Sequence, residues 1–449
     1  MTTNGNDLVA RFITETTWDR LPPAVQGQAR RALLDTLGAA LAGTQTPISR
    51  IASQAAVTIW PGDEATLLLK GRRASAVGAA FANGSAANAI DIDDCAIYTK
   101  GHPGAQLFPT ALAVVESRGM SGAALLAALV VGYEVAHRAA RIWHATREMY
   151  QACGSWGSVA CAAVAAHLMN LPPEQVGHAL GIAEYHAPNL PMMRDIDHPA
   201  MVKHGIGWGA MNGIVSALLA SGGYTGIPSL FGLEEYHDWV SDIGQQYIMA
   251  DGLAWKRYAC CAWDHAAMLG AQRLVREHSV RLEDIARIRV EGFHETVRLG
   301  VKLPTTTEEA QFSLAWPLAA LLLDGEVGPE QMLERRFDDP ALREVAGRIE
   351  LVESEVLNDL HRLALAADPR GKYASVVKIV LQDGRVLDSG IVEGEIGYPQ
   401  NVWDEASLES KFRWLAGSVL DEARIEQVVE MVWQLDRVPD VRALTRLIA

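Results

Sequence analysis

The sequence predicts a mainly α-helical protein, in which a large all-helical domain carries a smaller α+β domain inserted before the C-terminal helices. Apolar residues recur at helical spacing through the first half, β-like alternation begins after about residue 253, and helical spacing returns from Trp403 onward. A chain of 449 residues is also too long for one small core, so two domains are expected. We therefore assign residues 1–254 and 396–449 to the helical domain and residues 255–395 to the α+β domain.

The helical domain is predicted from apolar periodicity and from the residues that begin and end each segment. Pro22 and Pro23 suit a helix start, Gly43 suits its end, and between them apolar side chains recur at every fourth position: Val25, Ala29, Leu33, Leu37 and Leu41. Further helices are predicted over 76–90, 109–118, 122–143, 156–171 and 212–222. These segments are rich in Ala and Gly, so the helices should approach one another closely.

The α+β domain is predicted from a change of period. Residues 285–290 alternate between apolar and charged types, and 375–382 and 385–391 flank the turn signal Asp383-Gly384, which is typical of a hairpin. Helical segments lie between these strands, at 261–278, 310–323 and 338–349. The last helices are predicted from apolar residues that share one helical phase: Leu408, Phe412, Leu415 and Leu420.

Charge and cysteine content exclude several classes of function. With 39 basic and 54 acidic residues the net charge is −15, which argues against nucleic acid as a partner. An anionic substrate would then need locally concentrated Lys, Arg or His. The five cysteines form no C-x-x-C pair, so neither a disulfide framework nor an iron–sulfur cluster is expected.

No targeting or membrane segment is expected. The first seven residues are polar, without the basic and apolar regions of a signal peptide. The longest apolar run, residues 122–133, is closed by Glu134 and is too short to span a bilayer. We expect a cytoplasmic protein with no membrane partner.

Residues 91–104 (DIDDCAIYTKGHPG) concentrate chemistry between two apolar segments. Three carboxylates, one lysine and one histidine occur in a dozen residues, and crowded carboxylates are costly unless a cation, hydrogen bonds or protonation relieves them. A solvated turn, or an Asp N-cap for the helix after Pro109, is the plainer interpretation. His102-Pro103-Gly104 favours a site, because it sets an acid/base-capable ring on a stiff, sharply turned backbone at the start of an apolar helix.

Motifs along the chain resemble the MmgE/PrpD family, which includes 2-methylcitrate dehydratase, cis-aconitate decarboxylase and iminodisuccinate epimerase. The resemblance covers nearly the whole chain. Its motifs are 33–38 (LLDTLG) with 41–43 (LAG), 82–84 (ANG), 89–94 (AIDIDD), 101–104 (GHPG), 213–226, 256–258 (KRY) with His265, 310–314 (AQFSL) with 323–325 (LDG), and 411–413 (KFR). It implies a large helical domain with a smaller α+β lid, a homodimer, and catalysis without metal or other cofactor.

The resemblance also implies which residues form a site between the domains. Asp91, His102, Lys203 and Lys256 fall on or next to the family's active-site positions. This chain departs from the family at four positions that bear on the substrate, where it has Asn88, Cys95, Gln151 and Trp316.

The family's substrates are small acids with two or three carboxylates and an acidic C–H beside one of them. Loss of water, loss of CO2 and inversion at Cα all move a proton at that carbon. Lys203 and Lys256 would hold substrate carboxylates, although each could also be a solvated helix-end lysine. His102 is the candidate proton carrier, because its pKa lies near working pH, and it could instead be a structural cap.

Further residues have supporting or reserve roles. Asp91 or Asp93 would orient His102 or bind a lysine. His204 and His265 are reserve acid/base candidates, and His265 is equally well explained as a buried core histidine. Tyr258 could donate to a substrate oxygen or simply pack. We include Cys95, Gln151, Trp316 and His204 among the substrate-binding candidates.

The function we predict is a cofactor-independent lyase acting on a small di- or tricarboxylic acid, like 2-methylcitrate dehydratase or cis-aconitate decarboxylase. An epimerase or isomerase that uses the same Cα proton transfer is the first alternative. A metal-dependent hydro-lyase using Asp91, Asp93, Asp94 and His102 is the second, although D-x-D-D in one loop lacks the spacing of a known ligand set. A non-enzymatic helical scaffold is the third, and it would not need charged groups between Ala-rich helices.

Overall fold

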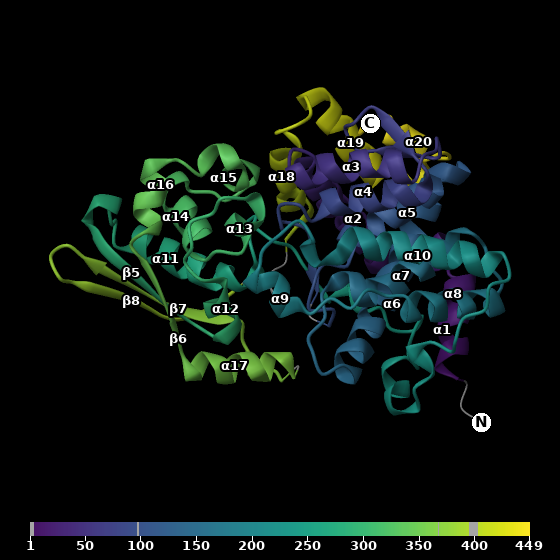
Figure 1. Cartoon of the computed structure of the whole chain (residues 1–449), viewed down its shortest axis with the longest axis horizontal. Coiled ribbons are helices and arrows are strands. Elements are labelled where there is room, and N and C mark those ends of the chain that lie inside the picture. The colour runs from purple at the N-terminus through teal and green to yellow at the C-terminus, as the bar shows by residue number, and fades with distance from the viewer. Residues whose placement is uncertain (1–3, 97, 367, 395–402) are drawn as a thin grey trace.

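The computed structural model describes residues 4–96, 98–366, 368–394 and 403–449. Helices dominate, and a four-stranded sheet lies at one end of the molecule (Figure 1). The predicted fold class, mainly α with a smaller α+β part, is confirmed.

The helical part is built around a core of small and branched side chains. Helices α6 and α7 pack against each other, and α7 packs closely on α10. Its helices before the α+β part are α1 (Gly5–Glu15), α2 (Pro23–Gly43), α3 (Pro47–Ile59), α4 (Ala76–Ala87), α5 (Gly104–Arg118), α6 (Gly122–Thr146), α7 (Cys153–Leu168), α8 (Pro173–Tyr185), α9 (Met192–Asp197) and α10 (Ile206–Ser221). Two short antiparallel strand pairs accompany them, β1 (Ala65–Leu67) with β2 (Arg72–Ala74), and β3 (Cys95–Ala96) with β4 (Leu253–Ala254).

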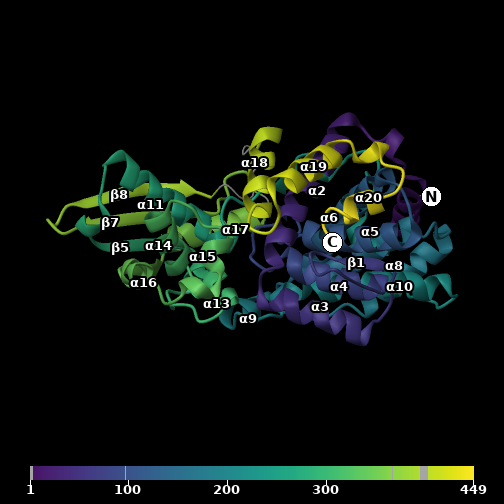
Figure 2. The ribbon, with the colours of Figure 1, turned by 90° about the horizontal axis from the view of Figure 1, so that it is seen from above.

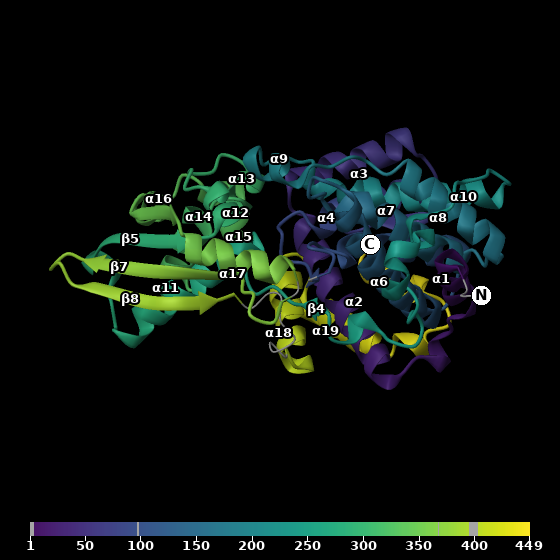
Figure 3. The same ribbon diagram turned by 90° about the horizontal axis from the view of Figure 1, so that it is seen from below.

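The α+β part is organised on a sheet with the strand order β6-β5-β7-β8. The predicted hairpin is present as antiparallel β7 (Ala374–Leu381) and β8 (Val386–Glu393), while β5 (Ile285–Gly292) pairs parallel to β6 (Ile349–Glu353). Helix α11 covers one face of β7 and β8, and α17 contacts β5 and β7 (Figure 3). The helices of this part are α11 (His265–Glu277), α12 (His294–Leu299), α13 (Thr307–Gln311), α14 (Ala315–Asp324), α15 (Pro329–Met332), α16 (Pro340–Ala346) and α17 (Glu355–Leu365).

The C-terminal helices lie on the helical part, as Figure 2 shows in yellow. They are α18 (Glu405–Ala416), α19 (Glu422–Trp433) and α20 (Arg442–Thr445), and α18 packs against α2. The proposed boundary at residues 395 and 396 lies outside the described residues. We retain the division at 254/255 and 395/396 as a proposal.

Most predicted helix ends differ from the structure by a few residues, and the single helix predicted over 310–323 is divided into α13 and α14. Two of the differing ends shape the loop that joins α4 to α5. Helix α4 ends at Ala87, because the side chain of Asn88 donates to Asp93 and Asp91 takes a left-handed φ of +53°. Helix α5 begins at Gly104, well before Pro109, and its first N–H donates to Asp94 Oδ1 at 3.0 Å. That carboxylate supplies a partner which an orphan helix N–H otherwise lacks.

Helix α6 extends three residues beyond the helix predicted over 122–143. It is the one described helix that is long and apolar enough to cross a membrane, but 89% of its apolar window is buried inside the protein. Glu134 does not end it, because this carboxylate pairs with Arg138 one turn later at 2.6 Å and accepts the N–H groups of Ile248 and Met249. This burial is the pattern of a core helix.

Candidate active site

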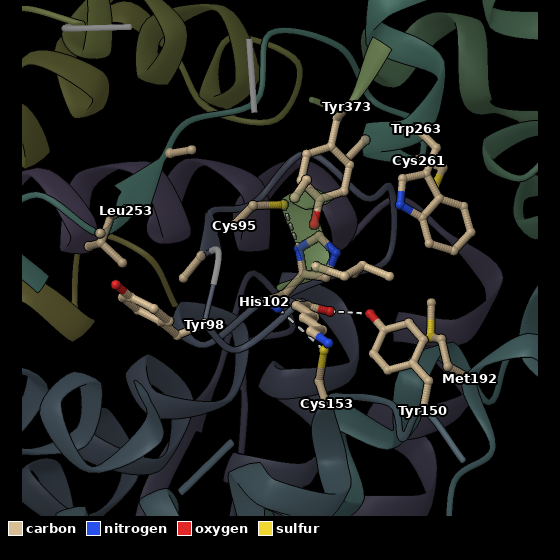
Figure 4. A pocket seen from close by; sticks show the side chains of 18 of the residues that line it. Cys95, Tyr98, His102, Tyr150, Cys153, Met192, Leu253, Cys261, Trp263 and Tyr373 are labelled. Atoms are coloured by element: carbon tan, nitrogen blue, oxygen red, sulfur yellow. Dashed lines mark hydrogen bonds between the residues drawn. The ribbon is translucent and has the colours of Figure 1, made fainter. Parts of the chain in front are cut away.

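A cavity of about 610 Å³ is lined by side chains from both parts of the chain. The helical part contributes the loop that holds Asp91 and His102, the start of α7, the segment from Met192 to His204 and the segment before β4. The α+β part contributes the stretch before α11 together with residues of α12, α13–α14 and α17. Figure 4 shows His102 at its centre, with Tyr98 and Leu253 to one side and Tyr150, Met192 and Trp263 to the other.

His102 is held between two carboxylates of its own loop. Its Nε2 lies 3.2 Å from Asp91 Oδ1, and its Nδ1 lies 3.2 Å from Asp93 Oδ2 and 2.8 Å from the carbonyl oxygen of Asp94. Asn88 fixes Asp93 by donating to its other oxygen at 2.8 Å. The crowded acidic loop therefore folds around an imidazole, and the charge of this ring reduces the repulsion between the carboxylates of the loop.

The electrostatics of this cluster favour the charged form of the imidazole. Burial alone would lower the pKa of His102, but Cys95, Asp93 and Asp91 outweigh it and hold the pKa well above its ordinary value. Burial would likewise raise the pKa values of Asp91 and Asp93, yet Lys256 for Asp91 and His102 for Asp93 hold them below the usual range. These shifts and the contacts of both ring nitrogens favour an imidazolium between two carboxylates.

Lys256 completes this charge cluster from the segment that enters the α+β part. Its Nζ lies 2.6 Å from Asp91 Oδ1, and both side chains are buried. The attraction of Asp91 overcomes burial and raises the pKa of Lys256. Lys256 is not among the described residues that line the cavity, and it lies behind Asp91.

Asp94, the third acidic residue of the loop, has a structural role. Its oxygens accept the Gly104 N–H and, at 2.7 Å, the hydroxyl of Tyr133. Burial, with Asp93 and Asp35 nearby, raises the pKa of Asp94 to about 7. The plainer sequence interpretation, an Asp that caps the next helix, applies to this residue.

His204 lies beside His102 in a strained turn. The two rings are stacked, with centroids 5.7 Å apart and planes inclined by 4°. Lys203 and His204 have positive φ values of 34° and 56°, and Asp195 holds the turn by accepting the His204 N–H at 2.8 Å. Asp195 Oδ2 also lies 2.8 Å from His204 Nδ1. Strained backbone that the surroundings hold in place is a mark of functional sites.

Lys203 points toward the junction between the two parts. Its Nζ donates to Gln311 Oε1 at 2.8 Å and lies 4.7 Å from the centre of the Phe312 ring. Gln311 in turn donates to the carbonyl of Ala89, next to the acidic loop. Phe312 lines the cavity, but Lys203 is not one of the described residues in its wall.

Five further sequence candidates are divided between the site and the core. Cys95 lines the cavity, and its Sγ lies 3.8 Å from His102 Nδ1. Gln151 is buried beneath the wall, where its Oε1 accepts the Leu190 N–H at 2.7 Å. Tyr258 and His265 pack edge to face, and burial together with Lys256 lowers the pKa of His265 to about 3.

Trp316 lies farthest from the expected role. It is fully buried in the core of the α+β part, and its Nε1 donates to the carbonyl of Gln331 at 2.9 Å. Its ring meets Phe337 edge to face. The structure therefore gives Trp316 a packing environment and no contact with the cavity among the described residues.

Sequence reasoning did not select Lys100, Asp195 or Tyr150. Lys100 is the only lysine or arginine among the lining residues that the structure describes, and no described carboxylate lies within ion-pair distance of its Nζ. Tyr150 holds the turn at Lys100 by donating its hydroxyl to the Lys100 carbonyl. Lys100 and Asp195 both had a signal in the sequence, because each lies inside a charged stretch, residues 91–102 and 194–198 respectively. Tyr150 had no comparable signal.

One group of side chains in the described part of the chain has metal-like geometry. A ligand atom from each of Asp91, His102 and His204 lies within 4.8 Å of the others. The predicted metal set was Asp91, Asp93, Asp94 and His102. The observed group contains His204 in place of Asp93, which pairs with His102 Nδ1, and Asp94, which is engaged by Gly104 and Tyr133. However, the ammonium of Lys256 already contacts Asp91 Oδ1, which disfavours a second cation at that oxygen.

Both parts of the chain match models of one protein family. The model of the MmgE/PrpD N-terminal domain matches residues 7–239, and the model of the MmgE/PrpD C-terminal domain matches residues 258–435. The chain belongs to the MmgE/PrpD family.

Curated relatives match this chain along almost all of their length. The cis-aconitate decarboxylase-like protein oryM of Aspergillus oryzae is 26% identical over 98% of this chain and 96% of its own. A cis-aconitate decarboxylase of Aspergillus terreus is 26% identical over 96% of this chain and 93% of its own. The human cis-aconitate decarboxylase is 26% identical over 94% of this chain and 89% of its own.

Proposed function

We propose that this protein is a lyase that removes CO2 or water from a carboxylic acid through proton transfer at a carbon next to a carboxylate. The observation that carries the proposal is the buried imidazole of His102, which is held between Asp91 and Asp93 on the wall of the cavity. Family membership supports dehydratase or decarboxylase chemistry, and the decarboxylase relatives make a cis-aconitate-like acid the first candidate.

His102 is the proposed proton carrier. As an imidazolium it would deliver a proton to the carbanion left when CO2 departs. In loss of water it would protonate the leaving hydroxyl, while a separate base, for which the neighbouring His204 is the candidate, takes the proton from carbon. Asp91 and Asp93 would hold the ring and stabilise its charged form, and Lys256 would keep Asp91 ionised. Two carboxylates with two cations leave the cluster close to neutral, so an acidic substrate would not face a net negative wall.

Lys100, together with the histidines, is the proposed receiver of a substrate carboxylate. Its Nζ forms no ion pair with a described carboxylate, and burial lowers the pKa of the ammonium. An arriving carboxylate would favour the charged form again and would gain a charge-assisted bond from it. Lys203 is a second candidate for binding a substrate carboxylate, provided that its hydrogen bond to Gln311 is replaced by one to the substrate.

Lys100→Met should raise KM by roughly ten- to a hundredfold, because a lost charge-assisted contact costs about 1.5–3 kcal/mol. The kcat should change much less, and so should the melting temperature. Steady-state kinetics checks this, with Lys302→Met as the control, since Lys302 is an exposed lysine paired with Glu309. An unchanged KM for Lys100→Met would remove Lys100 from the site.

The reaction itself can be tested by following candidate acids by NMR in D2O. Cis-aconitate and related di- and tricarboxylic acids would be incubated with the full chain. Deuterium incorporation at carbon, an alkene product or CO2 loss would each identify the reaction. Exchange or inversion without elimination would favour the epimerase alternative, and no change in any acid would contradict the proposal.

A metal-dependent hydro-lyase is the second candidate, favoured by the geometry of Asp91, His102 and His204. We expect EDTA treatment followed by gel filtration to leave turnover unchanged, because Lys256 already occupies Asp91 Oδ1 as a cation. Turnover would be measured before and after treatment. Loss of activity that one divalent metal restores would establish the metal alternative instead.

We also propose a homodimer that forms through an apolar patch around a small cavity of about 150 Å³. The exposed members of the patch are Ile51, Met201, Val202 and Trp208, which are 48%, 41%, 62% and 52% exposed. Clustered apolar side chains of this kind are typical of interaction surfaces.

Light scattering after size exclusion should give twice the chain mass of 48.6 kDa. Trp208→Glu should shift the protein toward the monomer, because it places a charge in the patch. Ile391→Glu, at an exposed position on the outer strand β8, should not. A monomeric wild-type protein would contradict the proposal.

A further inference from the structure

The cavity has an apolar wall that belongs to neither of the two main cores. A small separate cluster joins the parts of the chain, with Met192 on the helical side and Cys261 and Phe312 on the α+β side. Partly buried side chains extend it toward the cavity, and its lining members are Tyr150, Met192, Met193, Cys261, Trp263 and Phe312. We call these six residues the bridging wall. Figure 4 shows Tyr150, Met192, Cys261 and Trp263 together on one side of His102.

The cavity is large for a small acid. Its volume of about 610 Å³ lies within the range of about 300–1,000 Å³ that encloses drug-sized ligands. A short di- or tricarboxylic acid held at His102 and Lys100 would leave the bridging wall uncovered. Methionine and aromatic side chains that face water inside a cavity gain free energy when an apolar group of a ligand covers them.

The charged residues elsewhere in the wall do not offer further places for carboxylates. Asp242 pairs with Arg138 at 2.7 Å, Glu295 with His361 at 3.0 Å, and Asp368 with Arg370 at 2.7 Å. Away from His102, His204 and Lys100, the charged side chains of the described lining are thus paired carboxylates, the His361 that pairs with Glu295, and Asp251, which adds a further negative charge. Among the described residues, a second or third carboxylate far from His102 and Lys100 would find no further Lys or Arg in the wall, and His361 is already paired with Glu295.

We propose that the substrate carries an apolar arm, an alkyl or aryl substituent of several carbons, which lies on the bridging wall while its carboxylate end lies at His102 and Lys100. This inference rests on the proposed function and narrows its substrate class. Methionine side chains suit this role, because they are flexible and adapt to an apolar partner of irregular shape.

The test compares two unreactive acids with the same head: succinic acid and 2-hexylsuccinic acid. Calorimetric titration of the full chain gives the dissociation constant of each acid. A competition titration, in which succinic acid displaces 2-hexylsuccinic acid, shows that both acids bind at the same site. We expect the hexyl compound to bind at least tenfold more tightly, because its methylenes leave water for the bridging wall. Met193→Gln should remove most of that advantage and leave the affinity for succinic acid unchanged.

Met431→Gln is the matched control, since Met431 is also half-buried but lies on α19 outside the cavity. It should leave the affinity for both acids unchanged. Equal or weaker binding of the hexyl compound would overturn the inference while the proposed function stands. If Met193→Gln keeps the full difference in affinity between the hexyl compound and succinic acid, the apolar arm does not lie on the bridging wall. Failure of both acids to bind, with no acid turned over in D2O, would overturn the proposed function and this inference with it.

Discussion

His102→Gln is expected to lower kcat by roughly two to four orders of magnitude, the usual contribution of one positioned acid or base. Glutamine can keep a hydrogen bond in the loop but cannot carry the proton. The imidazole contacts both Asp91 and Asp93, so its removal also leaves Asp93 without its cationic neighbour. That carboxyl should respond by taking up a proton near neutral pH, which limits the loss of stability.

Single-turnover kinetics and thermal unfolding together check this prediction. His167→Gln is the control, because His167 is a partly buried histidine outside the cavity whose Nδ1 lies 2.7 Å from the carbonyl of Ile13. It should leave kcat unchanged. Near-native kcat in a folded His102→Gln protein would move the search for the proton carrier to His204, which stacks on His102.

The acidic loop shows what a sequence can reveal about a site. The density of charge between apolar segments was visible without a structure, and it correctly indicated that something must relieve Asp91, Asp93 and Asp94. Which group relieves each one was not visible. Lys256 reaches Asp91 from 165 residues away, and Tyr133 reaches Asp94 from 39 residues away. Such pairings depend on tertiary packing, which spacing in the sequence does not encode.

The fold was easier to predict than the site because period and turn chemistry act locally. The hairpin around Asp383-Gly384 and the helix from Pro23 to Gly43 follow from a few neighbouring residues. The start of α5 does not, because the partner of its first N–H is the side chain of Asp94. Pro109 looked like a helix start and instead lies inside a helix whose beginning was fixed elsewhere.

The placement of the lysines was the hardest part of the site to predict, because it depends on the partner that each lysine meets in the folded chain. Lys203 and Lys256 were both expected to hold substrate carboxylates. The structure gives the first a glutamine and the second an aspartate, whereas Lys100 lines the cavity. Lysines at different places in the site therefore have different expected phenotypes. Substitution of Lys100 should affect binding, and substitution of Lys256 should affect the integrity of the site.

Lys256→Met should lower the free energy of unfolding by about 3–5 kcal/mol, because it leaves the buried Asp91 carboxylate without its closest cation. Activity should fall as well, since Asp91 holds His102 only while it is ionised. Urea unfolding of the full chain measures the change. Lys372→Met is the matched control, because Lys372 forms a 3.0 Å pair with Glu393 that is partly exposed, and such pairs contribute about 0–1 kcal/mol.

The double variant Asp91→Asn/Lys256→Met separates the ion pair from its surroundings. Removing both charges leaves no unpaired buried carboxylate, so most of the lost stability should return, since replacing a whole buried pair is often neutral or even stabilising. Activity should not return, because a neutral amide at position 91 cannot stabilise the imidazolium of His102. A stable but inactive double variant would show that the pair serves the chemistry more than the fold. Lys256→Met alone could instead lower the free energy of unfolding by less than about 1 kcal/mol, as loss of an exposed ion pair does. That result would show that water reaches Asp91 and would contradict the water-excluded charge cluster that the burial of these side chains implies.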